Sequence, residues 1–195
     1  EVLNPDHPAS SVLNTAEYAF DGMEKAHYYL RLIQFALDTV PQRIDTESYL
    51  DTVMASFMEN GRITPDVSIS GDLCDVSGQL HLMSEVTSSL CEVTCSGSAP
   101  AFGVSVVKRG SLEIPDDLPG EPQQFLKVEI KRVDGGKLNH LPDDICDQEA
   151  PWDPAAGMTG EAEINLLCLV MMLSGGSLLR DARPGKVSLI FPCAD

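Results

Sequence analysis

Histidine is the side chain of this sequence best suited to acid, base or nucleophilic chemistry near neutral pH. The four histidines are His7, His27, His81 and His140. His27 falls within a long predicted helix and His81 beside a second apolar helical face, whereas the other two fall in predicted loops. No Gly-x-Ser-x-Gly, His-Glu-x-x-His or Gly-x-x-x-x-Gly-Lys motif accompanies them. The sequence therefore lacks the common signatures of hydrolases and of phosphate-binding loops.

The chain is strongly acidic, with a formal net charge of −17 at pH 7. Such a charge repels nucleic-acid backbones and anionic membrane surfaces, so we expect basic, locally neutral or apolar partners. No signal peptide is visible, and the apolar run Ile164–Leu173 is too short to cross a bilayer. We therefore expect a soluble protein without nucleic-acid or membrane partners.

The cysteines have no framework spacing and no paired metal-ligand spacing. Cys168 lies in an apolar helix, where a free thiol behaves as a small hydrophobe. We expect reduced thiols, no metal site and a cytoplasmic location. The cysteines are Cys74, Cys91, Cys95, Cys146, Cys168 and Cys193.

A long helix is predicted near the N-terminus, starting around Asn4-Pro5-Asp6-His7-Pro8 and ending before Pro41. Apolar residues recur along it at alternating spacings of four and three, the heptad pattern of helices that pack against other helices. A lone helix with so narrow an apolar face is not stable in water, so we expect a homodimer joined through a helical-hairpin or four-helix bundle. We call these residues the heptad seam: Val12, Ala16, Ala19, Met23, Ala26, Leu30, Ile33 and Leu37.

The remaining sequence alternates between helical and strand patterns, which predicts an α+β fold with helices on one face of a mixed sheet. A helix capped by Asp45 or Thr46 is expected to bury Leu50, Val53, Met54, Phe57 and Met58, and a second helix Val76, Leu80, Met83, Val86 or Thr87, and Leu90. Pro65 suggests an edge position or a bulge for the strand over residues 62–69. Further predicted elements are strands over 102–106 and 126–130, loops over 110–124 and about 134–160, a helix over 164–173, a Ser174-Gly175-Gly176 helix stop, and a hairpin of 177–180 and 186–191.

The closing helix, Gly-Gly step and hairpin resemble the end of the ATP-binding domain of sensor histidine kinases, and the element order resembles a Bergerat-type α/β sandwich. The whole chain resembles the ChpT-type bacterial histidine phosphotransferases. ENGRITPDVSI is similar to the family's first strand, and the segment around SGGSLL to its last helix and hairpin. The segment from Asn4 to Leu37 is similar to its second bundle helix, including Tyr28, Tyr29, Arg31, Phe35, Ala36 and Leu37.

Kinases of this fold hold Mg²⁺ with an Asn and adenine with an Asp-x-Gly-x-Gly loop, and they dock phosphate on a Gly-rich turn. The matching helix here offers Ser84, Glu85, Thr87, Ser88 and Ser89, and no Asn. Asp134-Gly135-Gly136 lacks the loop's spacing and is read as a simple turn. Glu161 and Glu163 follow Gly157 and Gly160 where polyphosphate would dock. We expect no ATP binding and no cofactor, with Mg²⁺ supplied only by a partner.

The resemblance implies a histidine that accepts a phosphoryl group from one receiver domain and donates it to another. In the family this histidine lies on the first bundle helix and is followed by an acidic residue, so the acceptor is expected before residue 1. His27 is the second candidate, although Tyr28 follows it instead of a carboxylate.

An aromatic and polar patch lies off the heptad seam and is a candidate docking site for receiver domains, because Tyr and Arg are enriched at interface hot spots. The alternative is that its tyrosines pack against the chain's own α/β domain. The patch consists of Tyr28, Tyr29, Arg31 and Gln34.

The sequence thus predicts two parts: residues 1–41 as a helical dimerisation and phosphotransfer element, and residues 42–195 as a degenerate Bergerat-like α/β domain. The predicted function is a histidine phosphotransferase that serves response-regulator receiver domains in a phosphorelay. The alternative is a non-catalytic dimeric scaffold of the same fold. A third possibility, an ATP-dependent kinase, requires saturable Mg-ATP binding.

Overall fold

The computed structural model describes residues 23–24, 26–59, 63–95, 98–108, 124–138, 150–151, 162–180 and 185–194. Several features of the sequence lie outside these residues. They are the seam residues Val12, Ala16 and Ala19, together with His7, His140, Cys146, Glu161, the loop over 110–123 and the segment 139–149. Within them, strands form one mixed six-stranded sheet in the order β2-β4-β5-β8-β7-β6 and a separate two-stranded ribbon of β1 and β3. The N-terminal helix covers residues 26–38. The other elements are β1 (Gln42–Ile44), α2 (Thr46–Glu59), β2 (Asp66–Ser70), β3 (Val76–Gly78), α3 (Leu80–Thr94), β4 (Pro100–Lys108), β5 (Gln124–Arg132), β6 (Ala150–Pro151), α4 (Ala162–Leu173), β7 (Ser177–Arg180) and β8 (Lys186–Pro192).

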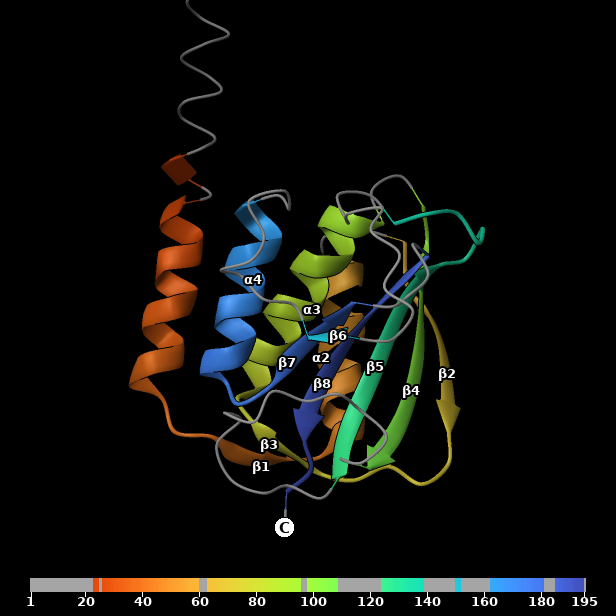
Figure 1. The fold of residues 1–195 in the computed structure, drawn as a ribbon, viewed down its shortest axis with the longest axis horizontal. Helices are drawn as coiled ribbons and strands as arrows, with labels where there is room; N and C mark the ends of the chain where they lie inside the picture. The colour runs from red at the N-terminus through yellow and green to blue at the C-terminus, as the bar shows by residue number, and fades with distance from the viewer. Residues whose placement is uncertain are drawn as a thin grey trace, which may run out of the picture.

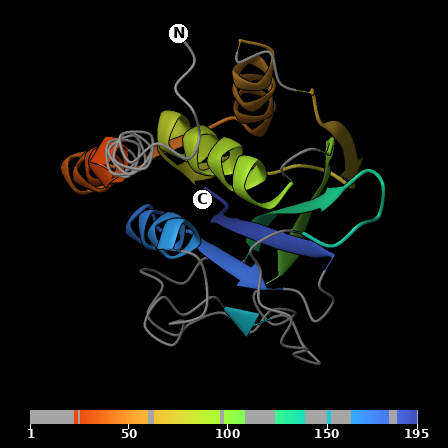
Figure 2. The ribbon, with the colours of Figure 1, turned by 90° about the horizontal axis from the view of Figure 1, so that it is seen from above.

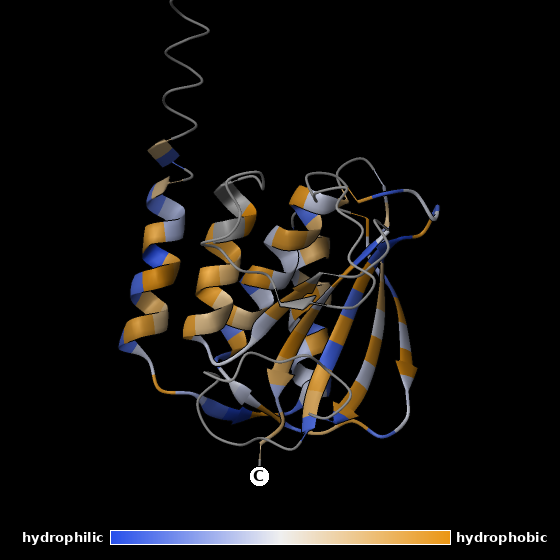
Figure 3. Ribbon diagram, viewed as in Figure 1, coloured by the Kyte–Doolittle hydropathy of each residue, from blue (hydrophilic) through white to orange (hydrophobic). Residues whose placement is uncertain are grey.

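The predicted layer arrangement is confirmed, since α2, α3 and α4 cover one face of the sheet (Figures 1 and 2). Alternation along β5 explains how this face is built, because successive side chains of a strand point to opposite sides. Leu126, Val128 and Ile130 are fully buried toward the helices. Lys127 and Glu129 occupy the intervening positions, and Figure 3 shows this change of hydropathy along the strands.

The edge position predicted from Pro65 is also confirmed. β2 begins at the next residue, Asp66, lies at one end of the sheet and pairs only with β4 among the described strands, in parallel. Proline has no N–H to donate to a second neighbour, so an edge suits it. The other pairings of the sheet are antiparallel.

The helix α2 begins where the sequence predicts. Asp45 caps it, since its Oδ2 accepts a 2.9 Å hydrogen bond from the Ser48 N–H and a 3.0 Å bond from the Ser48 hydroxyl. These two bonds lower the pKa of Asp45. Leu50, Val53 and Phe57 are buried as expected, but the prediction was wrong for Met58, which is mostly exposed at the last turn.

The second predicted helix starts later than expected, because Val76 belongs to β3 and α3 begins at Leu80. Val76 is still fully buried, since β3 turns it into the core. The helix stop at the end of α4 is confirmed: Gly175 has φ = 81° and the Gly176 N–H donates to the Met171 carbonyl at 3.0 Å. The hairpin of β7 and β8 follows.

The expectation of reduced thiols was wrong for one pair of cysteines. Cys74 and Cys193 form a disulfide across a sequence separation of 119 residues. Sequence spacing carries no signal for such a pair, because the fold alone brings the segment before β3 to the end of β8. Cys91, Cys95 and Cys168 are buried and form no disulfide, and burial raises the pKa of the Cys95 thiol.

Candidate functional site

The N-terminal helix lies beside α3 and α4 at the edge of the helical layer (Figures 1 and 2). One side of it packs into the core through Tyr29, Leu32 and Ala36. Within the described part of the heptad seam, Ile33 packs against the core, whereas Met23, Leu30 and Leu37 are 63%, 64% and 66% exposed. The helix therefore has two apolar faces, one covered by its own chain and one facing solvent.

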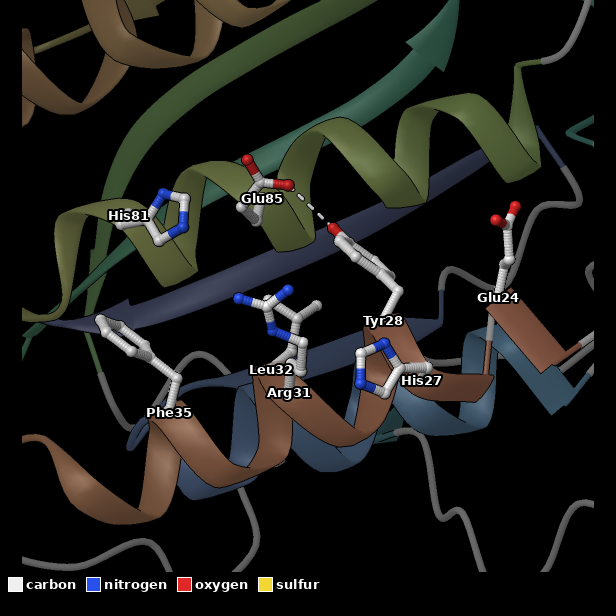
Figure 4. Close-up of a pocket in the computed structure, with 8 residues that line it drawn as sticks. All are labelled: Glu24, His27, Tyr28, Arg31, Leu32, Phe35, His81 and Glu85. Carbon is white, nitrogen blue, oxygen red and sulfur yellow. Dashed lines mark hydrogen bonds between the residues drawn. The ribbon is translucent and has the colours of Figure 1, made fainter.

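A groove with a volume of about 580 Å³ runs between the N-terminal helix and α3. Figure 4 shows that Arg31 reaches up between the two helices, with the His81 ring on one side of it and Tyr28 on the other. The lining combines apolar, acidic and nitrogen-bearing side chains: Glu24, His27, Tyr28, Arg31, Leu32, Phe35, His81 and Glu85.

Tyr28 bridges this groove by hydrogen bonding. Its hydroxyl donates to Glu85 Oε2 at 2.8 Å and lies 3.2 Å from Ser89 Oγ. Burial raises the pKa of Tyr28 to about 12, and the Glu85 carboxylate adds to this rise. At neutral pH the hydroxyl is therefore protonated and able to donate.

Two further contacts seat the helix along α3. The Phe35 and His81 rings meet edge to face with centroids 5.8 Å apart. At the end of the helix, Thr39 Oγ1 donates to Gln79 Oε1 at 2.5 Å, and Gln79 Nε2 donates back to the Thr39 carbonyl at 2.9 Å. The contacts pair Thr39 with Gln79, Phe35 with His81, and Tyr28 with Glu85. Because the numbers fall along one helix as they rise along the other, the two helices run antiparallel.

The packing of the N-terminal helix buries one residue of the predicted docking patch and leaves the other three exposed. Tyr29 is only 6% exposed and lies inside the chain's own core, with its ring 5.3 Å from that of Tyr28. Tyr28 and Arg31 line the groove, and Gln34 is exposed beside it. Both tyrosines thus contact the chain's own α/β domain, as the alternative reading proposed.

The two groove histidines are accessible imidazoles. His27 and His81 are exposed on facing helices, and no hydrogen bond to either ring is found within the described residues. An imidazole with a free ring nitrogen can act as a nucleophile or a base. No cluster of three or more His, Cys, Asp or Glu side chains that could hold a metal ion is found in the described ranges.

The sequence reading missed His81, Phe35, Glu24 and Glu85 as neighbours in one site. A signal for part of it was present, because Tyr28 and Phe35 are seven residues apart and therefore share a helix face off the seam. On α3, His81 and Glu85 are four residues apart and likewise share a face. The sequence alone gives no sign that these two faces meet.

The Asp134-Gly135-Gly136 segment is a turn, as predicted. The Gly135 N–H donates to the Arg132 carbonyl at 3.1 Å, and Gly135 has φ = 70°. Arg132 holds the Asp134 carboxylate with bonds of 3.0 Å from Nε and 2.7 Å from Nη2, and Ser98 Oγ and the Gly136 N–H add two more. These donors, Arg132 first, lower the pKa of Asp134 well below its usual range. Both carboxylate oxygens of Asp134 thus accept hydrogen bonds from neighbouring residues of the same domain.

The polar residues of α3 are mostly used within the fold. Ser84 and Thr87 are buried and donate to carbonyls one turn earlier, and Ser88 donates to Ser56 on α2 at 3.3 Å. Glu85 is the polar residue of α3 whose side chain lines the groove together with His81. None of the helices in the described part of the chain is long and apolar enough to pass through a bilayer.

No protein-family model and no curated protein matches the sequence. Solved structures match its fold. The Acinetobacter baumannii histidine kinase AdeS matches with a TM-score of 0.52 and 14% identity, covering 100% of this chain and 88% of that one. Full-length ShkA, solved in complex with AMPPNP, matches with a TM-score of 0.50 and 11% identity, covering 100% of this chain and 40% of ShkA. The ATP binding domain of PrrB from Mycobacterium tuberculosis matches with a TM-score of 0.47 and 15% identity, covering 80% of this chain and 100% of that one.

At these identities the likeness concerns the fold. The first two matches and the layer of helices on a mixed sheet establish a histidine-kinase-like α+β fold.

Proposed function

We propose that this chain is a histidine phosphotransferase that relays a phosphoryl group between receiver domains, acting as a cytoplasmic homodimer without ATP. The observation that carries the proposal is the double-faced N-terminal helix: one face is seated on a histidine-kinase-like domain, and the other exposes the seam residues Met23, Leu30 and Leu37. An ATP-independent relay needs a helical docking element and a rigid support more than it needs a nucleotide site.

Homodimerisation is supported by the exposed part of the seam. Met23, Leu30 and Leu37 lie seven residues apart, which aligns them along one line of a supercoiled helix. Leaving three large apolar side chains in water forfeits the free energy of their burial, about 1.5–3 kcal/mol each. Helices of a second copy, joined in a four-helix bundle of which residues 1–41 form a part, would recover it.

The absence of ATP binding is supported by the state of Asp134. In the resemblance this residue stands where kinases hold adenine, yet its oxygens here accept bonds from Arg132, Ser98 and the Gly136 N–H. Purine binding would have to break part of this network. The sequence also places Glu161 and Glu163 where phosphates would dock, and carboxylates repel polyphosphate.

Receiver docking is assigned to the outer surface of the N-terminal helix and the groove beside it. Tyr28, Arg31 and Gln34 supply exposed aromatic and polar contacts, while the buried Tyr29 keeps the helix in place. In the transfer, an imidazole nitrogen attacks the phosphorus of the receiver's aspartyl phosphate, so that an N–P bond forms, the P–O bond to the carboxylate breaks, and the imidazolium then loses a proton. The receiver supplies Mg²⁺.

The test is to mix the full-length protein with a receiver domain phosphorylated on its aspartate and to look for acid-labile phosphate on the protein. Peptide mapping then locates the phosphohistidine, with His27→Ala and His81→Ala as matched variants. Transfer to the protein and onward to a second receiver supports the relay. Binding of the receiver without transfer supports the non-catalytic scaffold instead, and saturable Mg-ATP binding in a calorimeter would overturn the ATP-free proposal.

A further inference from the structure

The Cys74–Cys193 disulfide is the one covalent cross-link found in the described residues, and it lies at a junction. Cys74 precedes β3, and Cys193 directly follows β8. Both cysteines are half-buried, whereas Cys91, Cys95 and Cys168 are buried. A thiol reagent in solution therefore has better access to this pair than to the three buried cysteines.

The disulfide joins the six-stranded sheet to the β1–β3 ribbon, which lies below the helical layer in Figure 1. Two backbone contacts accompany it: an isolated bridge between Val76 and Cys193, and a 2.8 Å hydrogen bond from the Ala194 N–H to the Asp75 carbonyl. These contacts hold the start of β3 against the end of β8.

The ribbon in turn carries the N-terminal helix. β1 follows that helix after residues 39–41, and Gln42 pairs with Gly78 of β3. The next residue, Gln79, exchanges two hydrogen bonds with Thr39. The chain of contacts from the disulfide to the helix therefore passes through one short ribbon and one side-chain clamp.

We propose that Cys74–Cys193 is a redox site whose state sets how firmly the ribbon, and with it the N-terminal helix, is held on the α/β domain. A thiolate of glutathione or of a dithiol protein attacks one sulfur and forms a mixed disulfide, and a second thiolate releases it. Two electrons and two protons pass to the cysteines, and the reductant leaves as its own disulfide. The inference does not depend on phosphotransfer.

We expect reduction to leave the rest of the fold in place, because buried apolar contacts also hold the ribbon on the domain. Ile44 and Val76 keep the ribbon anchored by burial, and the Arg43–Asp75 ion pair of 2.6 Å remains. The expected result is a looser ribbon on an intact domain. Protection of amides against hydrogen exchange reports such local opening.

The experiment compares hydrogen exchange of the full chain in oxidised and reduced glutathione buffers, with peptide mapping to follow the Cys74–Cys193 link. We expect exchange in residues 42–44, 76–78 and 26–38 to rise about tenfold on reduction, with β5 unchanged as internal reference. In the double variant Cys74→Ser/Cys193→Ser, the exchange rates should match those of the reduced chain and should be the same in both glutathione buffers. Far-UV circular dichroism monitors the fold. Failure to form the link, a change confined to residues 193–194, or global unfolding on reduction would each overturn the proposal.

Discussion

The Tyr28 hydroxyl donates a 2.8 Å hydrogen bond to the Glu85 carboxylate across the groove between the N-terminal helix and α3. The bond links the N-terminal helix to α3, and its two residues line the groove together with His27 and His81. A carboxylate that accepts from a phenol at this position fixes the helix without burying a charge. The bond therefore contributes, with the buried Tyr29, Leu32 and Ala36, to holding the helix on the domain.

Replacing Tyr28 with Phe should destabilise the protein by about 0.5–1.5 kcal/mol, a range typical of one hydrogen bond, and by its lower part because Tyr28 is 36% exposed. Urea unfolding of Y28F measures this change. Phe35→Leu is the matched control for ring packing at the same interface, and it should leave the Tyr28–Glu85 bond intact. A Y28F chain as stable as the wild type would show that the bond does not seat the helix.

The raised pKa of Tyr28 gives the same contact a pH dependence. Because the folded pKa of about 12 lies above the ordinary value of 10.0, this group's contribution is fully present below pH 10 and is lost as the pH rises toward 12. Ultraviolet titration of tyrosinate detects the late-ionising group. Glu85→Gln should lower its midpoint, although burial, the larger cause, will hold it above 10.0.

The exposed seam predicts a specific effect on self-association. Leu30→Glu or Leu37→Glu should weaken dimerisation by at least about tenfold, since burying a carboxylate in a helical interface costs more than 1.4 kcal/mol. The fold of the single chain should persist, because both side chains already face solvent. Sedimentation measures the assembly, with Gln34→Glu as a control of equal charge off the seam. Unchanged association in both seam variants would contradict the proposed bundle.

Inside the domain, the buried Tyr49–Thr87 pair offers a cycle of substitutions. The Thr87 hydroxyl donates to the Met83 carbonyl at 2.8 Å, so it is the Tyr49 hydroxyl that donates across the 2.7 Å contact. Thr87→Val leaves a buried phenol without an acceptor and should cost about 1–3 kcal/mol, whereas Tyr49→Phe should cost about 1 kcal/mol. The double variant should cost less than the sum, and strict additivity in thermal unfolding would argue against the bond.

Much of the α/β domain was predictable because its strands and helices have one buried face each. Leu126, Val128 and Ile130 alternate, and Leu50, Val53 and Phe57 follow helical spacing, so local pattern and tertiary burial agree. The short strands β1 and β3 escaped prediction, since three residues are too few for a periodic signal.

The N-terminal helix shows where pattern reading fails. Its strongest period marks the seam, yet the side that packs on the domain is Tyr29, Leu32 and Ala36. A helix with two apolar faces gives two overlapping periods, and the sequence does not say which face its own chain covers. The groove depends on that choice, and so does the presence of His27 and His81 along the same groove.

The Asp134 network predicts an acid titration. Arg132, the largest cause, keeps the folded pKa of Asp134 below its ordinary value of 3.8. The stabilising contribution is therefore present above that value and is lost as the pH falls from about 4 toward the folded pKa. Carbon NMR of the carboxyl group should find its midpoint well below 3.8, and Arg132→Gln should move it upward, while Lys131→Gln on the neighbouring exposed position should not. Equal midpoints in the wild type and R132Q would contradict the network.

The two glycines after α4 should respond differently to the same added methyl group. A Cβ on Gly176 would lie 2.7 Å from the Ile190 carbonyl and 2.8 Å from Met171 Cε, and a backbone atom of β8 cannot easily move away. A Cβ on Gly175 meets nothing within 4 Å, although φ = 81° is strained for alanine. We expect Gly175→Ala to cost about 1–2 kcal/mol from the left-handed backbone. Gly176→Ala should cost about 1–3 kcal/mol from overpacking, toward the upper end because the neighbour is backbone. Thermal unfolding of the two variants measures which one is destabilised more. A smaller loss of stability in Gly176→Ala than in Gly175→Ala would show that β8 moves to accommodate the methyl group.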